Sequence, residues 1–522
     1  MIRYQNLDQT KGFSQLKELA IPSVVEHFTK ENLESQSIRA GADLTFNYAG
    51  KGINQALLSA LQALADEQQV IDKYELLLSG EMMNTGEKRK VLHHLTRAQQ
   101  AGEVLFHNEN LRHFYQQQQK RFSDFANKVH TGEILGSTGK KITTVVQVGI
   151  GGSDLGPRAL YLALQNLYLS KLEAKFISNV DPDDAAIIID SCDLERTLFI
   201  LVSKSGTTQE TLANRNFVLE AAAKQQILNF IPNKHMVCVT SQTSPLAKDD
   251  SYLVSFFIDD FIGGRYSSTS AVGGVVLSLA FGSDVFDELL EGAADADAHA
   301  RHRDIAQNAA LMDALIGLYE RNIKGYPSTA ILPYSQALSR FPAHLQQLDM
   351  ESNGKSVNRD AQLISYSTGP TIFGEPGTNG QHSFYQLLHQ GTDIIPLQFI
   401  GFSRSQCAVD YDFEGSTSQT KLNANLAAQI SAFVLGKSEP SNLNKNFAGG
   451  RPASLLYAPQ LSARTLGALL AHYENKVMFQ GFLWNLNSFD QEGVQLGKVL
   501  ANEILSNKAD ATIMHLFGLL EG

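Results

Sequence analysis

The sequence predicts an α/β protein with a doubly wound, mainly parallel sheet and flanking helices, a second α/β unit after it, and a helical N-terminal region. Short apolar runs alternate with helical segments between residues 143 and 257, which is typical of βαβ units. Strand character resumes at residue 328, after a long helical stretch. At 522 residues the chain is too long for one hydrophobic core, so we expect two domains.

The N-terminal region, up to about residue 117, is predicted to be mostly helical. Apolar residues recur at helical spacing in QALLSALQALA (55–65) and in KVLHHLTRA (90–98).

The parallel sheet is predicted from apolar runs that are too short to be buried helices. A helix is expected over residues 154–164, after the first run. In such sheets ligands bind beyond the carboxyl ends of the strands, where the strand order reverses. The expected strands are 143–150, 175–180, 198–202, 235–240 and 251–257.

The C-terminal half is predicted to form the second α/β unit. Residues 284–322 are helical in pattern, 328–334 have strand character, and 465–478 have strong helical spacing. The two halves show no convincing sequence repeat, although two sheets of similar type are compatible with the pattern.

Charge, cysteine content and hydropathy exclude several functional classes. The formal net charge of −11 and the absence of a basic stripe argue against a nucleic-acid partner. No apolar run approaches the roughly 20 residues that span a bilayer, so we expect no membrane insertion. Three widely spaced cysteines and an N-terminus without a signal-peptide pattern predict a cytoplasmic location.

Residues 203–208, SKSGTT, form a polar loop between a predicted buried strand and a predicted helix. Four hydroxyls, Lys204 and Gly206 occupy these six positions. A strand that enters a helix through such a turn directs backbone N–H groups and the positive helix end at one point, which suits a phosphate. A helix-capping box is the commoner explanation of such residues, but a cap needs only one hydroxyl. We therefore favour an anion site.

A second glycine-rich turn, VGIGGSDLG (148–156), precedes this loop in the chain. The third glycine of a dinucleotide fingerprint is replaced by Asp154, which disfavours a dinucleotide-binding oxidoreductase. Its glycines still allow close approach of a ligand, and Ser153 can donate to a phosphate. Both loops then converge on one anion.

Four further motifs have unremarkable explanations when each is considered alone. Arg265 in GGRYSSTS could be a surface arginine in a turn, and Glu351 in MESNGK a solvated residue near a helix end. His382 at a helix start could be a structural hydrogen-bonder, and Lys498 an exposed helical cation.

Together and in this order, the motifs resemble those of the glucose-6-phosphate isomerase (phosphoglucose isomerase) family. The resemblance extends from about Asn84 to Leu500. It rests on six motifs: GIGGSDLGP (149–157), SKSGTTQET (203–211), GGRYS (263–267), QLDMESNGK (347–355), GEPGTNGQH (374–382) and FDQEGVQLGK (489–498).

The resemblance implies a fold, a reaction and an assembly. The fold comprises two sugar-isomerase (SIS) type α/β domains: a smaller one over 118–283, and a larger discontinuous one over 1–117 and 284–522. The reaction is the aldose–ketose isomerisation of glucose 6-phosphate and fructose 6-phosphate in glycolysis and gluconeogenesis, without metal or organic cofactor. The assembly is a homodimer with composite active sites.

The resemblance also implies a role for each matching residue. Glu351 is the base that moves a proton between C1 and C2, and Arg265 stabilises the enediolate. His382, from the partner subunit, opens the sugar ring together with Lys498, and Glu210 orients that His. The phosphate-binding set is Gly152, Ser153, Ser203, Lys204, Ser205 and Thr208, and the substrate-positioning set is Gln347 and Gln491.

Several positions depart from the family pattern, although none is a proposed catalytic residue. They are Glu492, Asn485, Ser268, Thr269 and the pair Ser205–Gly206. Two alternatives therefore stay open: a dual phosphoglucose/phosphomannose isomerase, and a non-catalytic sugar-phosphate-binding regulator. The regulator needs the phosphate cradle but not Glu351, His382 and Lys498 together.

Overall fold

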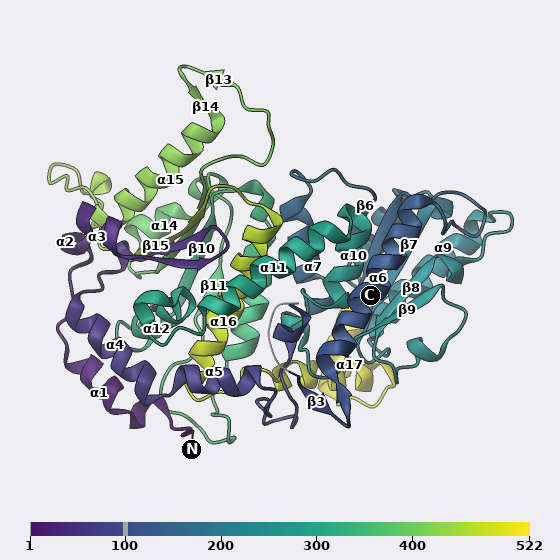
Figure 1. Ribbon diagram of the computed structural model, residues 1–522, viewed down its shortest axis with the longest axis horizontal. Helices are drawn as coiled ribbons and strands as arrows, with labels where there is room; N and C mark the ends of the chain where they lie inside the picture. Colours follow the sequence, from purple (N-terminus) through teal and green to yellow (C-terminus); the bar gives the residue numbers. More distant parts are fainter. Residues whose placement is uncertain (1, 98–102, 522) are drawn as a thin grey trace.

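The computed structural model describes residues 2–97 and 103–521, which contain two main sheets, seen in the right and left halves of Figure 1. One sheet has five strands and the other six. The α/β fold class predicted from the sequence, with mainly parallel sheets and flanking helices, is confirmed.

The five-stranded sheet is entirely parallel, in the order β6-β5-β7-β8-β9. The order reverses between β5 and β7, so their carboxyl ends flank the crevice where such sheets bind ligands. Both polar loops predicted to bind an anion leave from these two strands. The strands are β5 (Thr144–Val148), β6 (Glu173–Ile177), β7 (Thr197–Val202), β8 (Met236–Thr240) and β9 (Val254–Phe257).

Helices cover both faces of this sheet, which explains the unbroken apolar character of its central strand. In β7, Leu198 and Ile200 face the core that contains α6, α7 and α10. Phe199 and Leu201 face the core that contains α8 and α9. The flanking helices are α6 (Leu111–Thr131), α7 (Leu155–Leu164), α8 (Pro182–Asp190), α9 (Gln209–Gln225) and α10 (Ala271–Phe281).

The six-stranded sheet has the order β1-β2-β15-β12-β10-β11. Four strands are parallel, and an antiparallel hairpin, β1–β2, extends one edge by pairing with β15. The sequence did not predict this hairpin, because its strands are short and their partner is far away in the chain. The strands are β1 (Ser37–Gly41), β2 (Leu44–Asn47), β10 (Ser328–Pro333), β11 (Thr371–Phe373), β12 (Leu397–Phe402) and β15 (Ala453–Ala458).

The other helices either belong to the N-terminal region, before this second sheet in the chain, or follow residue 282 and surround the sheet. Those of the N-terminal region are α1 (Lys11–Glu18), α2 (Val24–His27), α3 (Lys30–Ser35), α4 (Gln55–Glu67) and α5 (Val70–Leu78). Those that follow residue 282 are α11 (Ser283–His299), α12 (Ala309–Asn322), α13 (Phe341–Gln346), α14 (Tyr385–Gln390), α15 (Ser418–Leu435) and α16 (Ala463–Leu483).

The prediction of a helix over residues 90–98 is wrong. Residues 93–96 form a short 3₁₀ turn instead, and Ala98 lies outside the described residues. The backbone N–H of Leu92 donates to the carbonyl of Phe261, and the Arg97 guanidinium bonds to Asp297 and Glu474. These tertiary contacts override the helical spacing of the apolar residues.

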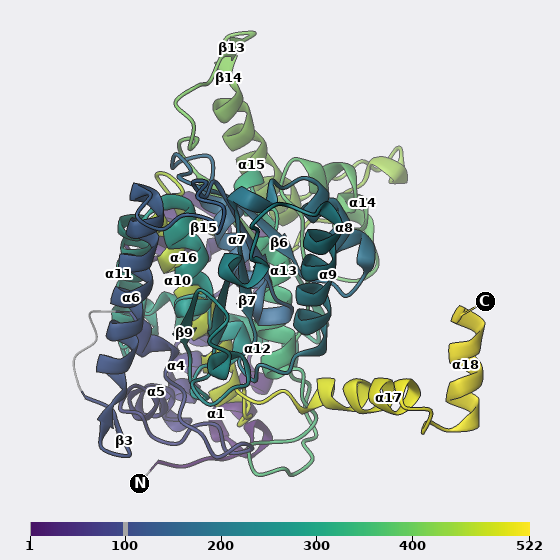
Figure 2. The same cartoon turned by 90° about the vertical axis from the view of Figure 1, so that its right-hand side faces the viewer.

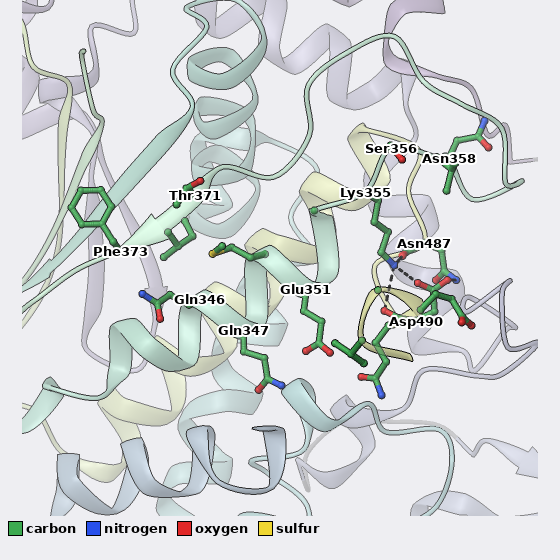
Figure 3. A pocket seen from close by; sticks show the side chains of 18 residues that line it. Gln346, Gln347, Glu351, Lys355, Ser356, Asn358, Thr371, Phe373, Asn487 and Asp490 are labelled. Carbon is green, nitrogen blue, oxygen red and sulfur yellow. Dashed lines mark hydrogen bonds and ion pairs between the residues drawn. The ribbon is translucent and has the colours of Figure 1, made fainter. Parts of the chain in front are cut away.

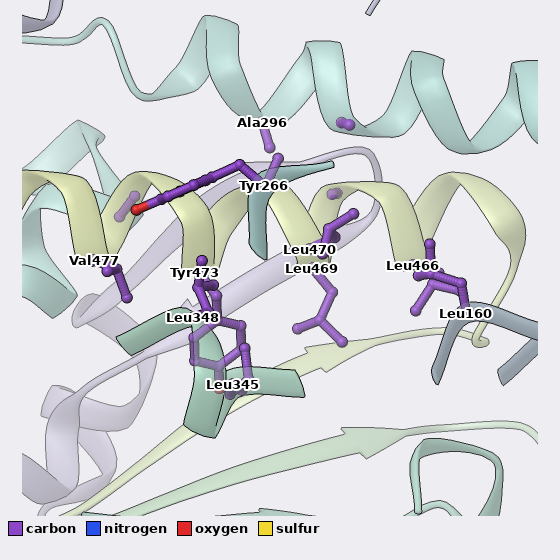
Figure 4. Close-up of a cluster of buried hydrophobic side chains, with 14 of the residues drawn as sticks. Leu160, Tyr266, Ala296, Leu345, Leu348, Leu466, Leu469, Leu470, Tyr473 and Val477 are labelled. Atoms are coloured by element: carbon purple, nitrogen blue, oxygen red, sulfur yellow. The ribbon is translucent and has the colours of Figure 1, made fainter. Parts of the chain in front are cut away.

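The helix α16 lies at the centre of the larger core (Figure 4). Every residue of this helix except Arg464 is buried. Its backbone touches that of α11: a Cβ on Gly467 would lie 1.9 Å from the carbonyl oxygen of Leu289. The Asn353 amide donates to the Val477 carbonyl of α16 at 2.9 Å. This rigid helix therefore supports the segment that carries Glu351.

The C-terminal helices α17 (Gln495–Leu505) and α18 (Ala511–Glu521) extend away from the body of the molecule (Figure 2). Neither has a buried residue. The hairpin of β13 (Asp412–Phe413) and β14 (Ser416–Thr417) also projects, beyond α15, and β3 (Leu105–Phe106) pairs with β4 (Glu109–Asn110). Within the described part of the chain, no helix is long and apolar enough to cross a membrane.

Candidate active site

A cavity of about 1040 Å³ lies beside the segment that carries Glu351, and we call it the base cavity (Figure 3). Three predicted site residues, Gln347, Glu351 and Gln491, line it. The segments that form its wall are 346–358, the strand β11 and residues 487–494. The cavity is thus assembled from parts of the chain that are far apart in sequence.

Glu351 is the last residue of a single π-helical turn, Gln347–Glu351, which continues α13. Helical structure persists to Asn353, so the predicted position near a helix end is confirmed. Such π-helical turns often occur at functional sites, because they displace side chains from regular helical positions. The Glu351 Oε2 atom is buried and accepts no hydrogen bond from any described residue.

Arg265 lies beside this carboxylate, with its Nη1 atom 3.7 Å from Glu351 Oε2. The side chain is almost fully buried, so the prediction of a surface arginine in a turn is excluded. Three hydrogen bonds fix the guanidinium. Its Nε donates to Ser352 Oγ at 2.6 Å, and its Nη2 donates to the carbonyls of Ser488 at 2.6 Å and Asp490 at 3.0 Å.

The glycine-rich turn after β5 packs directly against the Arg265 corner. A Cβ on Gly152 would lie 2.2 Å from the carbonyl carbon of Gly264, so only glycine fits there. A Cβ on Gly151 would lie 3.3 Å from the side-chain nitrogen of Gln347. The turn that contains Gly152 and Ser153 therefore adjoins both Arg265 and the segment that carries the base.

Residues 203–208, which we call the hydroxyl loop, form a compact turn organised by the buried Ser203. Its Oγ accepts the backbone N–H of Gly206 at 3.1 Å and lies 2.8 Å from Thr208 Oγ1. Gly206 has φ +69°, which favours glycine. Thr208 is the N-cap residue of α9 but makes no side-chain cap hydrogen bond. The capping box is therefore not what organises this loop.

The exposed hydroxyls of this loop face a second cavity of about 640 Å³, which we call the loop cavity. Ser205, Thr208, Glu210 and Lys498 line it together, and Glu210 lies in the first turn of α9. Lys498, in α17, thus lies opposite the hydroxyl loop rather than in the base cavity. The segment that carries Gln491 and Lys498 passes both cavities.

Lys204 extends toward a small cavity that it shares with Gly263, Gly264 and Gln491. Burial lowers the pKa of Lys204, while Asp260, whose carboxylate lies 3.9 Å away, opposes this effect. The ammonium group therefore lies between the hydroxyl loop and the Arg265 corner.

His382 is separated from the other predicted residues within this chain. It ends the 3₁₀ turn Asn379–His382, is exposed, and is not among the residues that line the cavities described above. The structure therefore brings Glu351, Arg265 and Gln347 together, gathers Lys498 with the hydroxyl loop, and leaves His382 outside both groups.

Sequence reasoning missed two charged residues in the base cavity, Lys355 and Asp490. The Lys355 ammonium bonds to the Asp490 carboxylate and to the Asn487 carbonyl (Figure 3). Burial lowers the pKa of Lys355, and its hydrogen bond to Asp490 opposes this effect. Both residues lie inside motifs that carried the resemblance, which was the one signal available for finding them.

Among residues 2–97 and 103–521, no group of three or more His, Cys, Asp and Glu side chains could hold a metal ion.

Comparisons with known proteins agree with the motifs. The sequence profile of the family Phosphoglucose isomerase matches residues 47–517. A glucose-6-phosphate isomerase of Treponema denticola is 59% identical over 97% of both chains, and one of Borreliella burgdorferi is 48% identical over 97% of this chain and 96% of its own. A crystal structure of a glucose-6-phosphate isomerase from Chlamydia trachomatis superposes with a TM-score of 0.93, at 42% identity, covering 99% of this chain and 100% of that one. The chain belongs to the phosphoglucose isomerase family.

Proposed function

We propose that this protein catalyses the reversible isomerisation of glucose 6-phosphate and fructose 6-phosphate. One observation carries the proposal: beside the base cavity, the Glu351 carboxylate and the Arg265 guanidinium each present an atom that has no hydrogen bond to a described residue, and these two atoms lie 3.7 Å apart. Moving a proton between two carbons requires a base at the carbon and a cation at the adjoining oxygen. Glu351 and Arg265 meet these two needs.

The proton transfer follows from this pair. In the open-chain aldose, Glu351 removes the proton from C2, and the electrons of that C–H bond form an enediolate with negative charge on oxygen. Arg265 Nη1 stabilises the charge, because a fixed cation in a buried site acts strongly on charge that develops there. Return of the proton to C1, with the O2 hydroxyl proton passing to O1, then gives the ketose, and Gln347 and Gln491 orient the substrate.

The phosphate is held by the hydroxyl loop. Ser203, Lys204, Ser205 and Thr208, which precede α9, form the proposed phosphate-binding set together with Gly152 and Ser153 of the turn after β5. The positive end of that helix favours an anion. Binding the unreactive end of the sugar in this way positions the reacting carbons against Glu351.

Ring opening needs a separate acid–base group, and we assign it to His382 of the partner subunit, acting with Lys498 and oriented by Glu210. The exposure of His382 supports a homodimer, as do the apolar side chains that α17 and α18 expose, including Leu496, Val499, Leu516 and Leu519. A histidine can exchange protons near neutral pH.

Three further assignments stay predictions: a cytoplasmic location, a reaction without an organic cofactor or metal, and the two SIS-type domains. The boundary proposed between residues 117 and 118 falls inside α6, and the one between 283 and 284 falls at the start of α11.

The proposal is tested by measuring conversion of fructose 6-phosphate with the wild type and with Glu351→Gln. Removing a general base is expected to lower kcat by about 10²- to 10⁴-fold while substrate still binds. An unchanged rate would refute the role of Glu351, and an inactive wild type that binds sugar phosphate would favour the regulator. Parallel assays with mannose 6-phosphate separate the dual isomerase from the single one.

A further inference from the structure

Ser352 directly follows Glu351 in the chain and is fully buried. Its Oγ atom accepts the Nε–H of Arg265 at 2.6 Å and lies 3.1 Å from the hydroxyl of Tyr266. This serine therefore connects the segment of the base to the corner that carries the cation, although the two are 87 residues apart.

Among the residues that the structure describes, the three hydrogen-bond acceptors of Arg265 are uncharged. They are the Ser352 hydroxyl and the carbonyls of Ser488 and Asp490. The Glu351 carboxylate lies 3.7 Å from Nη1, beyond hydrogen-bond distance. The guanidinium is thus fixed without a carboxylate hydrogen-bonded to it, and its charge remains available to a substrate oxygen.

Two anchored nitrogens determine where the third one points, because the guanidinium is a rigid plane. With Nε and Nη2 both bonded, Nη1 has a single direction, toward the Glu351 carboxylate. Without the Nε acceptor, the plane can turn about the Nη2 bonds and bring Nη1 into a direct pair with Glu351. That pair would neutralise the base and the cation together. Ser352 is also the one acceptor of the three that is a side chain.

We propose that Ser352 is a positioning residue of the isomerisation. By accepting the Nε–H bond it keeps Arg265 directed at the oxygen where enediolate charge develops, and prevents Arg265 from pairing with the base. The inference rests on the proposed function, since it gives Arg265 a transition-state role. Because Ser352 Oγ accepts from Arg265, its own proton points away from Arg265, and the Tyr266 hydroxyl lies 3.1 Å from this Oγ.

The first test is Ser352→Ala in the full-length protein. Because misplacing a catalytic group by about 1 Å can cost up to about 10²-fold, kcat is expected to fall by about 10- to 100-fold. The KM for fructose 6-phosphate is expected to change little. Ser278→Ala, at another fully buried serine, in α10, is the matched control for loss of a buried hydroxyl and should retain the wild-type rate.

The second test is a double-mutant cycle with Arg265→Met. If Ser352 acts through Arg265, Ser352→Ala should lower kcat by less than about twofold in the Arg265→Met background, because the two effects share one interaction. A purely structural role would give the same fold-loss in both backgrounds. Additive losses therefore overturn the proposal.

The third test compares two variants of equal side-chain volume, in case the alanine variant does not fold. Ser352→Thr and Ser352→Val have the same shape, but only threonine keeps the hydroxyl. We expect kcat of the threonine variant to exceed that of the valine variant by about tenfold or more, as for loss of a well-oriented contact. Equal rates would overturn the proposal. An inactive wild type would instead refute the proposed function, and the two failures are thereby distinguished.

Discussion

The base cavity and the hydroxyl loop are built in opposite ways. At the base cavity, charged groups are bound by distant segments: the buried Arg265 by Ser352, Ser488 and Asp490, and the half-buried Lys355 by Asp490. The hydroxyl loop is a single local turn. Its exposed Ser205 accepts hydrogen bonds from the backbone N–H and the hydroxyl of its neighbour Thr207.

This difference corresponds to two different tasks. Groups that stabilise charge in a transition state must be fixed before the substrate arrives, since reorganisation would add to the barrier. Groups that hold a phosphate need only offer donors around an anion, and exposed hydroxyls can rotate to do so. We therefore expect substitutions in the base cavity to lower kcat, and substitutions in the hydroxyl loop to raise KM.

Arg265→Met gives the largest effect predicted for this comparison. Loss of a preorganised charge-stabilising group costs about 10²- to 10³-fold in kcat, and the KM should stay near its wild-type value. Steady-state assays with fructose 6-phosphate measure both. Arg265→Lys is the graded control, because it keeps the charge but loses the planar fork. If Arg265→Met mainly raised the KM, Arg265 would belong with the binding groups.

Ser205→Ala combined with Thr208→Ala tests the other region. A hydrogen bond to a charged group contributes about 1.5–3 kcal/mol, so the KM should rise by at least about tenfold while kcat changes little. Thr207→Ala is the matched control, since Thr207 is an exposed hydroxyl of the same loop that is not assigned to the phosphate. A fall in kcat at unchanged KM would mean that the loop takes part in the chemistry.

Lys355→Met should have a smaller effect on the rate. It removes the ion pair with Asp490, whose carbonyl also accepts a hydrogen bond from Arg265 and whose neighbour Gln491 lines the cavity. A modest displacement of both residues should lower kcat/KM by about tenfold. Lys140→Met, which breaks a comparable pair with Glu195 away from these cavities, should leave kcat/KM unchanged. Equal losses in both variants would reveal general destabilisation.

The sequence predicted the local features of both regions better than the long-range ones. The strands of the parallel sheet and the hydroxyl loop are continuous segments, so hydrophobic runs and turn residues are sufficient to locate them. The contacts between Arg265 and Asp490, or between Lys355 and Asp490, join segments more than 130 residues apart. No periodicity in one chain encodes such a pairing.

The same limit explains the fold elements that the sequence missed. The hairpin β1–β2 depends on β15, and the segment 90–97 depends on Phe261, Asp297 and Glu474. His382 is a further case: its motif is plain in the sequence, but its predicted site is in another subunit. Resemblance located these motifs, and the structure explains which of them meet within one chain.

Asp349→Asn gives the smallest expected effect on the rate. It tests whether the rigid base cavity lowers the free energy of unfolding. Asp349 lies in the same π-helical turn as Glu351, is buried, and its Oδ1 accepts no hydrogen bond from a described residue. Burial raises its pKa from 3.8 to about 6, although the nearby Lys476 opposes this effect. The folded protein therefore binds more protons than the unfolded chain between about pH 4 and 6.

Asp349 therefore lowers the free energy of unfolding by an increasing amount as the pH rises through that window. The full reduction, about 3 kcal/mol, is present above pH 6. In urea unfolding, Asp349→Asn should therefore be more stable than the wild type at pH 7, and the advantage should shrink toward pH 4, while kcat changes little.

Asp313→Asn is the control of opposite sign. Lys476 and His472 hold the pKa of Asp313 well below its ordinary value against burial, so its loss should destabilise the protein at pH 7. If both variants were destabilised equally at pH 7, Asp349 would be a stabilising partner of Lys476, and the rigidity of the base cavity would carry no such cost.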